Sequence, residues 1–132
     1  MKLNVYEVNP LDDFDKEVGR LTRKKKFFTL PKQIKELTIK AAKGEFEGTL
    51  IKHSDNPTPY DVYKLRLPNP DADAGKSDGY RVIYMVVTQD KIVVLLTIYY
   101  KKETESVSDT YISGLIDGYW LNDSNDDEEI EI

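Results

Sequence analysis

The sequence predicts an α+β fold in which a strand and a helical hairpin precede an antiparallel sheet. Near the N-terminus, two adjacent segments repeat apolar residues at helical spacing, with proline or glycine beside them. Further along, three segments rich in β-branched and aromatic residues follow one another through short polar loops. At 132 residues, the chain has the length of one domain with a sizeable core.

The first elements are an expected strand and an expected helix. Residues 2–8 show the alternation of a short strand, and a proline ends it. A helix is predicted over residues 12–26, with three aspartates in its first turn, where they suit the positive end of the helix dipole. Phe14, Val18 and Leu21 follow at i, i+4 and i+7. They give this helix one apolar stripe.

The second helix has clearer boundaries. Residues 31–43 begin with a proline, which suits a first helical position, and Gly44 is a natural C-terminal stop. Leu37 lies on the apolar face, so the two helices are expected to form a hairpin. Residues 45–60 are predicted to be a loop, with an extended piece at 49–51.

A three-stranded meander follows. Residues 63–67 alternate apolar with cationic side chains, so this strand has one apolar face and one basic face. Residues 82–87 and 92–98 are almost continuously apolar, as expected of strands that are covered on both faces. A short amphipathic helix is expected to close the chain from about Val107.

Charge divides the chain into a body and a tail. The net charge is −5, yet six acidic residues and no basic residue lie after Leu121. We therefore expect a single domain over residues 1–120 and an acidic, disordered tail over residues 121–132. Residues 20–43 hold nine basic residues against one acidic residue. The basic run at residues 23–26 is either a solvated helix end or an RNA-contacting patch.

Composition excludes several classes of site. There is no cysteine, so disulfides and thiolate metal sites are excluded. No apolar run reaches the length of a membrane-spanning helix, and a cytoplasmic location is expected. We expect neither a metal site nor a cofactor.

Basic side chains occupy fixed points of the expected meander. Lys64 and Arg66 share one face of a strand, and Arg81 lies within an apolar run. Cations on a rigid sheet indicate a phosphate-binding surface. Two structural alternatives stay open. Lys64 and Arg66 could form the solvated face of an edge strand, and Arg81 could form a salt bridge with Asp61 or Asp78.

With these residues, the chain resembles the RelE/HigB superfamily of bacterial toxins, particularly its HigB-like branch. The matching motifs are Lys64-Leu65-Arg66, Gly75-Lys76-Ser77-Asp78-Gly79, Gly79-Tyr80-Arg81-Val82-Ile83-Tyr84 and Tyr100-Lys101-Lys102. The strand and helical hairpin that precede them match the family's element order. The resemblance therefore covers about residues 1–118.

The resemblance implies a RelE-like fold and a metal-independent endoribonuclease. Such toxins are mRNA interferases that cleave messenger RNA at the ribosome, and a cognate antitoxin protein neutralises them. In their reaction the 2′-OH of the RNA attacks the adjacent phosphate, which requires proton transfer and charge stabilisation by side chains. The alternative is a catalytically silent member of the fold that binds a partner protein or RNA.

The resemblance also implies roles for individual residues. The expected catalytic residues are Lys64, Arg66, Arg81 and Lys102. The expected substrate-binding residues are Lys76, Tyr100, Lys101 and Tyr111. Lys64 matches the basic position of the first meander strand, and the two arginines would bind the scissile phosphate through forked donors.

The chain departs from the family pattern at two positions. Ribosome-dependent members carry a second lysine where this chain has Val62. They also carry a catalytic tyrosine where this chain has Ser108, and Tyr111 or Tyr100 would have to substitute for it. Phosphate binding is therefore better supported by the sequence than cleavage.

Overall fold

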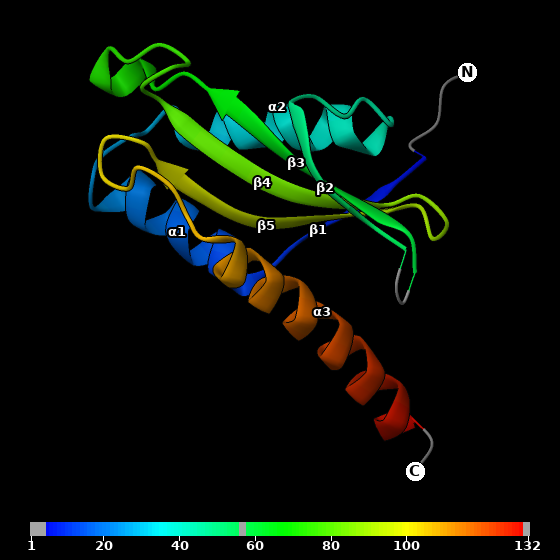
Figure 1. The fold of residues 1–132 in the computed structure, drawn as a ribbon. Coiled ribbons are helices and arrows are strands. Elements are labelled where there is room, and N and C mark those ends of the chain that lie inside the picture. Colours follow the sequence, from blue (N-terminus) through cyan, green and yellow to red (C-terminus); the bar gives the residue numbers. More distant parts are fainter. Residues whose placement is uncertain (1–4, 56–57, 131–132) are drawn as a thin grey trace.

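The structure, a computed structural model, describes residues 5–55 and 58–130 of the chain. It is α+β, as predicted. The elements, in chain order, are β1 (Glu7–Pro10), α1 (Asp12–Arg23), α2 (Leu30–Ala42), β2 (Thr49–Ser54), β3 (Tyr60–Leu67), β4 (Tyr80–Val87), β5 (Ile92–Tyr100) and α3 (Asp109–Ile130), with one 3-10 turn at Pro70–Ala72 (Figure 1).

The strands form one sheet in the order β1-β5-β4-β3-β2. The central part, β3-β4-β5, is the predicted antiparallel meander. The helical hairpin connects the two edge strands of the sheet, β1 and β2. Strand β1 pairs with β5 in parallel, and β2 pairs with β3 in antiparallel orientation. The expected loop over residues 45–60 thus contains a full strand. The expected first strand began at residue 2, and residues 2–4 lie outside the described part of the chain.

Helices cover both faces of the sheet, and each face has its own core. On one face, α1 and α2 contribute Phe14 and Leu37 to a cluster with Tyr84 of β4. On the other face, α3 contributes Ile112 and Ile116 to a second cluster. Every residue of β4 is buried, which confirms the prediction of a strand covered on both faces.

Helix α3 is longer than the predicted terminal helix. It runs for 22 residues, and Figure 1 shows it continuing well past the edge of the sheet. The helix passes residue 120, where we expected the domain to end, and the Trp120 ring lies 6.4 Å from that of Tyr60. The division into a body and a disordered tail stays a prediction. No helix in the described part of the chain is long and apolar enough to cross a membrane.

Candidate functional site

Three of the predicted basic residues meet on the α3 side of the sheet. Arg66 lies directly opposite Arg81 in the β3-β4 pairing, and Lys64 lies opposite Ile83. Residues opposite each other in an antiparallel pair project from the same face, and Ile83 packs in the core beneath α3. Arg66 is exposed and Lys64 is half-buried. We call Lys64, Arg66 and Arg81 the cationic face.

Arg81 is the buried member of the cationic face. Its side chain is only 4% exposed, and its guanidinium binds backbone carbonyls rather than carboxylates. Nη1 donates to the carbonyls of Lys76 at 2.8 Å and of Tyr80 at 3.2 Å, and Nη2 donates to that of Ser77 at 2.9 Å. These bonds fix the loop that precedes β4.

The salt bridge considered for Arg81 is not formed. Neither Asp61 nor Asp78 lies within ion-pair distance of Arg81, and the Asp61 carboxylate instead lies 2.7 Å from His53 Nδ1. Arg81 is therefore a buried cation without an anionic partner among the described residues, and it faces a second arginine across the strand pair. Like charges at directly opposite positions destabilise a sheet, so a bound anion would relieve this pair.

Further polar contacts hold the loop between β3 and β4 on α2. The Asp71 carboxylate accepts from the backbone N–H of Thr29 at 2.9 Å and from its hydroxyl at 3.0 Å. Gln33 Nε2 donates to the carbonyl of Pro68 at 2.9 Å. The loop is thus tied to β4 at one end and to α2 at the other, and it presents Lys76 to solvent.

The remaining residues predicted around the end of β5 lie in two different environments. Tyr100 is buried on the face of the sheet that α1 and α2 cover, where its ring centroid lies 5.2 Å from that of Phe27. The structure therefore does not bring Tyr100 to the cationic face. Lys101 follows it and is half-buried, with its backbone N–H donating to the carbonyl of Gly79 at 2.9 Å. Lys102 is exposed in the next turn.

A cleft of about 460 Å³ opens beside the cationic face, between α1, β5 and the start of α3. Its walls include Asp13 and Glu17 of α1, Thr97 and Tyr99 of β5, and Tyr111 of α3. Tyr99 is the direct partner of Arg81 in the β4-β5 pairing. The cleft therefore begins about one strand spacing, roughly 4.8 Å, from the cationic face.

Tyr111 is the predicted site residue that reaches into this cleft. Its phenol donates to Asp13 Oδ2 at 3.0 Å. Burial, and after it the hydrogen bond to Asp13, raises the pKa of Tyr111, while a hydrogen bond with Thr97 acts in the opposite sense. The phenol therefore keeps its proton at neutral pH. Ser108, at the position of the family's tyrosine, accepts the Tyr111 backbone N–H at 3.0 Å at the start of α3.

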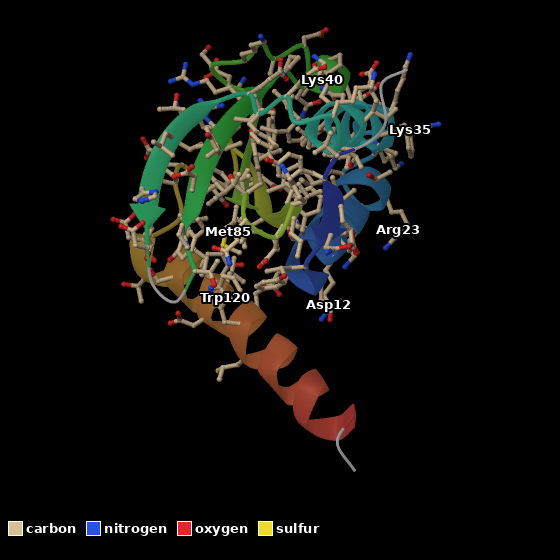
Figure 2. All side chains as sticks on the ribbon, turned by 90° about the vertical axis from the view of Figure 1, so that its right-hand side faces the viewer. Asp12, Arg23, Lys35, Lys40, Met85 and Trp120 are labelled. Atoms are coloured by element: carbon tan, nitrogen blue, oxygen red, sulfur yellow. The ribbon has the colours of Figure 1, made fainter. Side chains whose placement is uncertain are left out.

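The basic run after α1 lies on the side of the sheet that α1 and α2 cover, and it is partly neutralised. Figure 2 shows Arg23 on that side, away from Trp120. Glu103 lies 2.7 Å from the Arg20 guanidinium and 3.3 Å from Lys25. The structure thus favours a solvated, ion-paired helix end over an extension of the cationic face.

Two residues of the site, Asp13 and Thr97, carry no functional signal in the sequence. The local pattern marks Asp13 only as an acidic residue in the first turn of a helix, and Thr97 only as part of an apolar strand. Their place in the cleft depends on how α1 and α3 meet beside β5, which no local pattern encodes. In residues 5–55 and 58–130, no group of three or more His, Asp or Glu side chains could hold a metal ion.

Comparisons with known proteins give limited similarity. No family model and no curated protein matches the sequence. Among solved structures, the chain is similar to a free-state arginine double mutant of the E. coli toxin RelE, with 20% identity, a TM-score of 0.49, and coverage of 76% of this chain and 88% of that one. It is also similar to the archaeal RelE-RelB complex from Pyrococcus horikoshii OT3, with 21% identity, a TM-score of 0.42, and coverage of 74% and 96%. At these values, function is argued from this chain's own side chains.

Proposed function

We propose that this protein is a RelE-like toxin that cleaves messenger RNA at the ribosome and is neutralised by an antitoxin protein. The observation that carries the proposal is the cationic face, with three basic side chains that make no ion pair to a described residue, beside a cleft that holds a protonated tyrosine. A cytoplasmic location and membership of the HigB-like branch belong to the same proposal.

The cationic face suits an RNA phosphate. Arg66 is exposed, so its planar fork of donors is free to bind two phosphate oxygens at once. Arg81 is buried, so it contributes positive charge from beneath the surface, and it holds the loop that carries Lys76. We therefore assign it a positioning role and not a direct contact with the phosphate. Lys101 and Lys102 extend the positive surface at the end of β5. An antitoxin segment with acidic side chains would be attracted to the same surface.

The arrangement provides for cleavage by the RNA's own 2′-OH. Lys64, Ile83 and Thr97 are register partners across three strands, so Lys64 and Thr97 are about 10 Å apart across the sheet. Tyr111 reaches Thr97 from α3. A phosphate bound by Arg66 would lie beside the Lys64 amine on β3, and the Tyr111 phenol approaches the same face of the sheet from the β5 side.

The proposed reaction needs no metal. The 2′-oxygen forms a bond to phosphorus as the bond to the 5′-oxygen breaks, which leaves a 2′,3′-cyclic phosphate and a 5′-hydroxyl. The 2′-proton passes to solvent water, and the Lys64 ammonium stabilises the negative charge that builds up on the phosphoryl oxygens. Tyr111 gives its proton to the departing 5′-oxygen, acting as a general acid.

The second candidate is an RNA-binding module that does not cleave. Two observations favour it. Val62, at the position of the family's second lysine, is fully buried, and the Arg81 guanidinium already uses three of its N–H groups on carbonyls. Both reduce the number of groups that are free to act on a phosphate.

The test is cleavage of messenger RNA by purified protein on translating ribosomes, mapped by primer extension. Wild type should cut within the ribosomal A site, and both Arg66→Ala and Tyr111→Phe should lower the rate at least tenfold, since removing one charge-stabilising donor costs about 10²-fold or more in comparable sites. Lys35→Ala, a lysine on the far side of the sheet (Figure 2), is the matched control and should retain the rate. RNA binding without cleavage would select the binding module. The absence of both would refute the proposed function.

A further inference from the structure

We propose that the cleft between α1, β5 and α3 is a nucleobase pocket that selects bases with an exocyclic amino group, and that Asp13 reads this group. The inference rests on the proposed function, since it concerns the base of a nucleotide whose phosphate lies on the cationic face. It adds a recognition site to that surface, with a substrate preference that the phosphate contacts cannot supply.

The position of the cleft suits the base of such a nucleotide. Arg66, Arg81 and Tyr99 lie side by side on β3, β4 and β5, so a chain bound over the first two leads directly to the third. The volume of about 460 Å³ lies within the range of small-ligand pockets, roughly 300–1,000 Å³. Val107 supplies half-buried apolar surface against which a base can pack, and the buried Tyr99 forms part of the cleft wall.

Asp13 is the carboxylate in the cleft that is available to a ligand. The Glu17 carboxylate is held by the Arg20 guanidinium at 2.6 Å. Asp13 makes no ion pair to a described residue, and Tyr111 occupies only its Oδ2. This bond fixes the orientation of the carboxylate at the cleft wall, and Oδ1 makes no hydrogen bond to a described residue. Asp13 is exposed, so a donor on the ligand can replace the water that Oδ1 would otherwise bind.

The chemistry of the four bases then decides the preference. Guanine presents adjacent N1–H and amino donors, both of which can converge on Oδ1, and cytosine and adenine each present an amino group. Uracil places carbonyl oxygens beside its single N–H, and a carboxylate repels them. The phosphates themselves avoid Asp13 and remain on the cationic face. The pocket should therefore favour guanine most and uracil least.

The experiment measures binding of short 2′-O-methyl RNA, in which the methyl group blocks attack by the 2′-oxygen. A fluorescent uridine heptamer is compared with heptamers that carry one central guanosine, adenosine or cytidine, by fluorescence polarisation at low salt. Because the uridine background offers no amino group, the single substituted base sets the binding register. Wild type should bind the guanosine heptamer at least about fivefold more tightly than the uridine heptamer.

Matched variants separate base reading from charge. Asp13→Asn and Asp15→Asn remove the same charge from the same exposed turn of α1, but residue 15 does not line the cleft. Any general gain in RNA affinity should appear in both. The guanosine preference should fall below about twofold only in Asp13→Asn, since an amide can pair with uracil as well. Tyr111→Phe, which keeps the Asp13 carboxylate, should retain a preference.

The outcomes distinguish this inference from the proposed function. Equal binding of all four heptamers by wild type, together with weaker binding by Arg66→Ala, would overturn the base pocket and leave the cationic face in place. A preference that survives in Asp13→Asn would also overturn it. Failure of wild type to bind any heptamer, or binding that Arg66→Ala does not change, would overturn the proposed function and the pocket with it.

Discussion

The pairing of Arg66 with Arg81 predicts that this protein gains stability when one arginine is removed. The two residues are directly opposite on β3 and β4, Arg81 is 4% exposed, and neither has an ion-pair partner among the described residues. Arg66→Ala removes the exposed member. It leaves intact the three bonds that Arg81 makes to carbonyls, so loss of repulsion should be the main effect.

The size of the effect follows from the geometry. A directly opposed pair of like charges costs about 0.2–1 kcal/mol, and the Arg66 side chain, being exposed, loses little packing. At about 0.01 M ionic strength, where the screening length is about 30 Å, Arg66→Ala should raise the free energy of unfolding by about 0.5 kcal/mol. For a chain of this length, that corresponds to a Tm increase of about 2 °C.

Phosphate should act on wild type in the same direction and more strongly. An anion present at about a hundredfold its Kd adds about 2.7 kcal/mol to the stability of the folded state. Arg66→Ala should lose most of this gain, because the exposed donors are gone. Thermal unfolding at low ionic strength, with and without inorganic phosphate at matched ionic strength, measures both effects, and Lys35→Ala is the control for general charge.

Two results would refute this reasoning. If Arg66→Ala unfolds at a lower temperature than wild type at low salt, the two arginines do not repel each other in the folded state. If wild type, Arg66→Ala and Lys35→Ala gain equally from phosphate, the anion does not bind at the cationic face. The second result would also count against the phosphate-binding role that the proposed function gives to this face.

Three further predictions concern the scaffold. Gly79→Ala should destabilise the fold by on the order of 3 kcal/mol in urea unfolding, because an added Cβ would lie 2.1 Å from a backbone carbonyl oxygen of the β3 end. A hydrogen bond from Arg20 lowers the pKa of Glu103, so the stabilisation is present above the unfolded pKa of about 4.3 and lost as pH falls through the lower folded value. Glu103→Gln should therefore cost about 0.5 kcal/mol at pH 7 and less near pH 3. Asp61 is the largest cause of the raised pKa of His53, so Asp61→Asn should lower it in an NMR titration. The associated stability is present below about pH 6.5 and lost as pH rises through the folded pKa.

Patterns between residues close in sequence were enough to predict some of the helices and strands. The apolar stripe and the flanking proline and glycine predicted the second helix, and α2 runs from Leu30–Ala42. Strand β2 does not alternate like a half-buried strand. Its adjacent apolar residues Leu50 and Ile51 are both exposed, and a register shift lies between Leu50 and Lys52. The sequence therefore predicts only a short extended piece there. Its stability comes from pairing with β3, which is a contact distant in sequence.

The candidate site, like the fold, could be predicted from local patterns only in part. Alternation along one strand was enough to place Lys64 and Arg66 on one face, and the structure adds Arg81 to it. Tyr100 was assigned from the resemblance, and in the structure a register shift at Ile83/Tyr84 in the β4-β5 pairing accompanies its position on the α1–α2 face. A single extra residue moves the following side chains to the opposite face of a strand. Nothing in a continuous apolar run marks the position of such a residue.

Arg81 shows how a sequence signal can be correct while its interpretation changes. A cation in an apolar run indicates a partner or a task. The structure supplies partners, but they are backbone carbonyls, which satisfy hydrogen bonds without neutralising the charge. An apolar residue at this position would avoid the cost of burying a cation opposite Arg66, but it would release the loop that carries Lys76. The arginine therefore fixes the loop and keeps positive charge beneath the surface where Arg66 is exposed. Both effects favour an anion at this point of the sheet, and the phosphate-dependent stability of wild type measures them together.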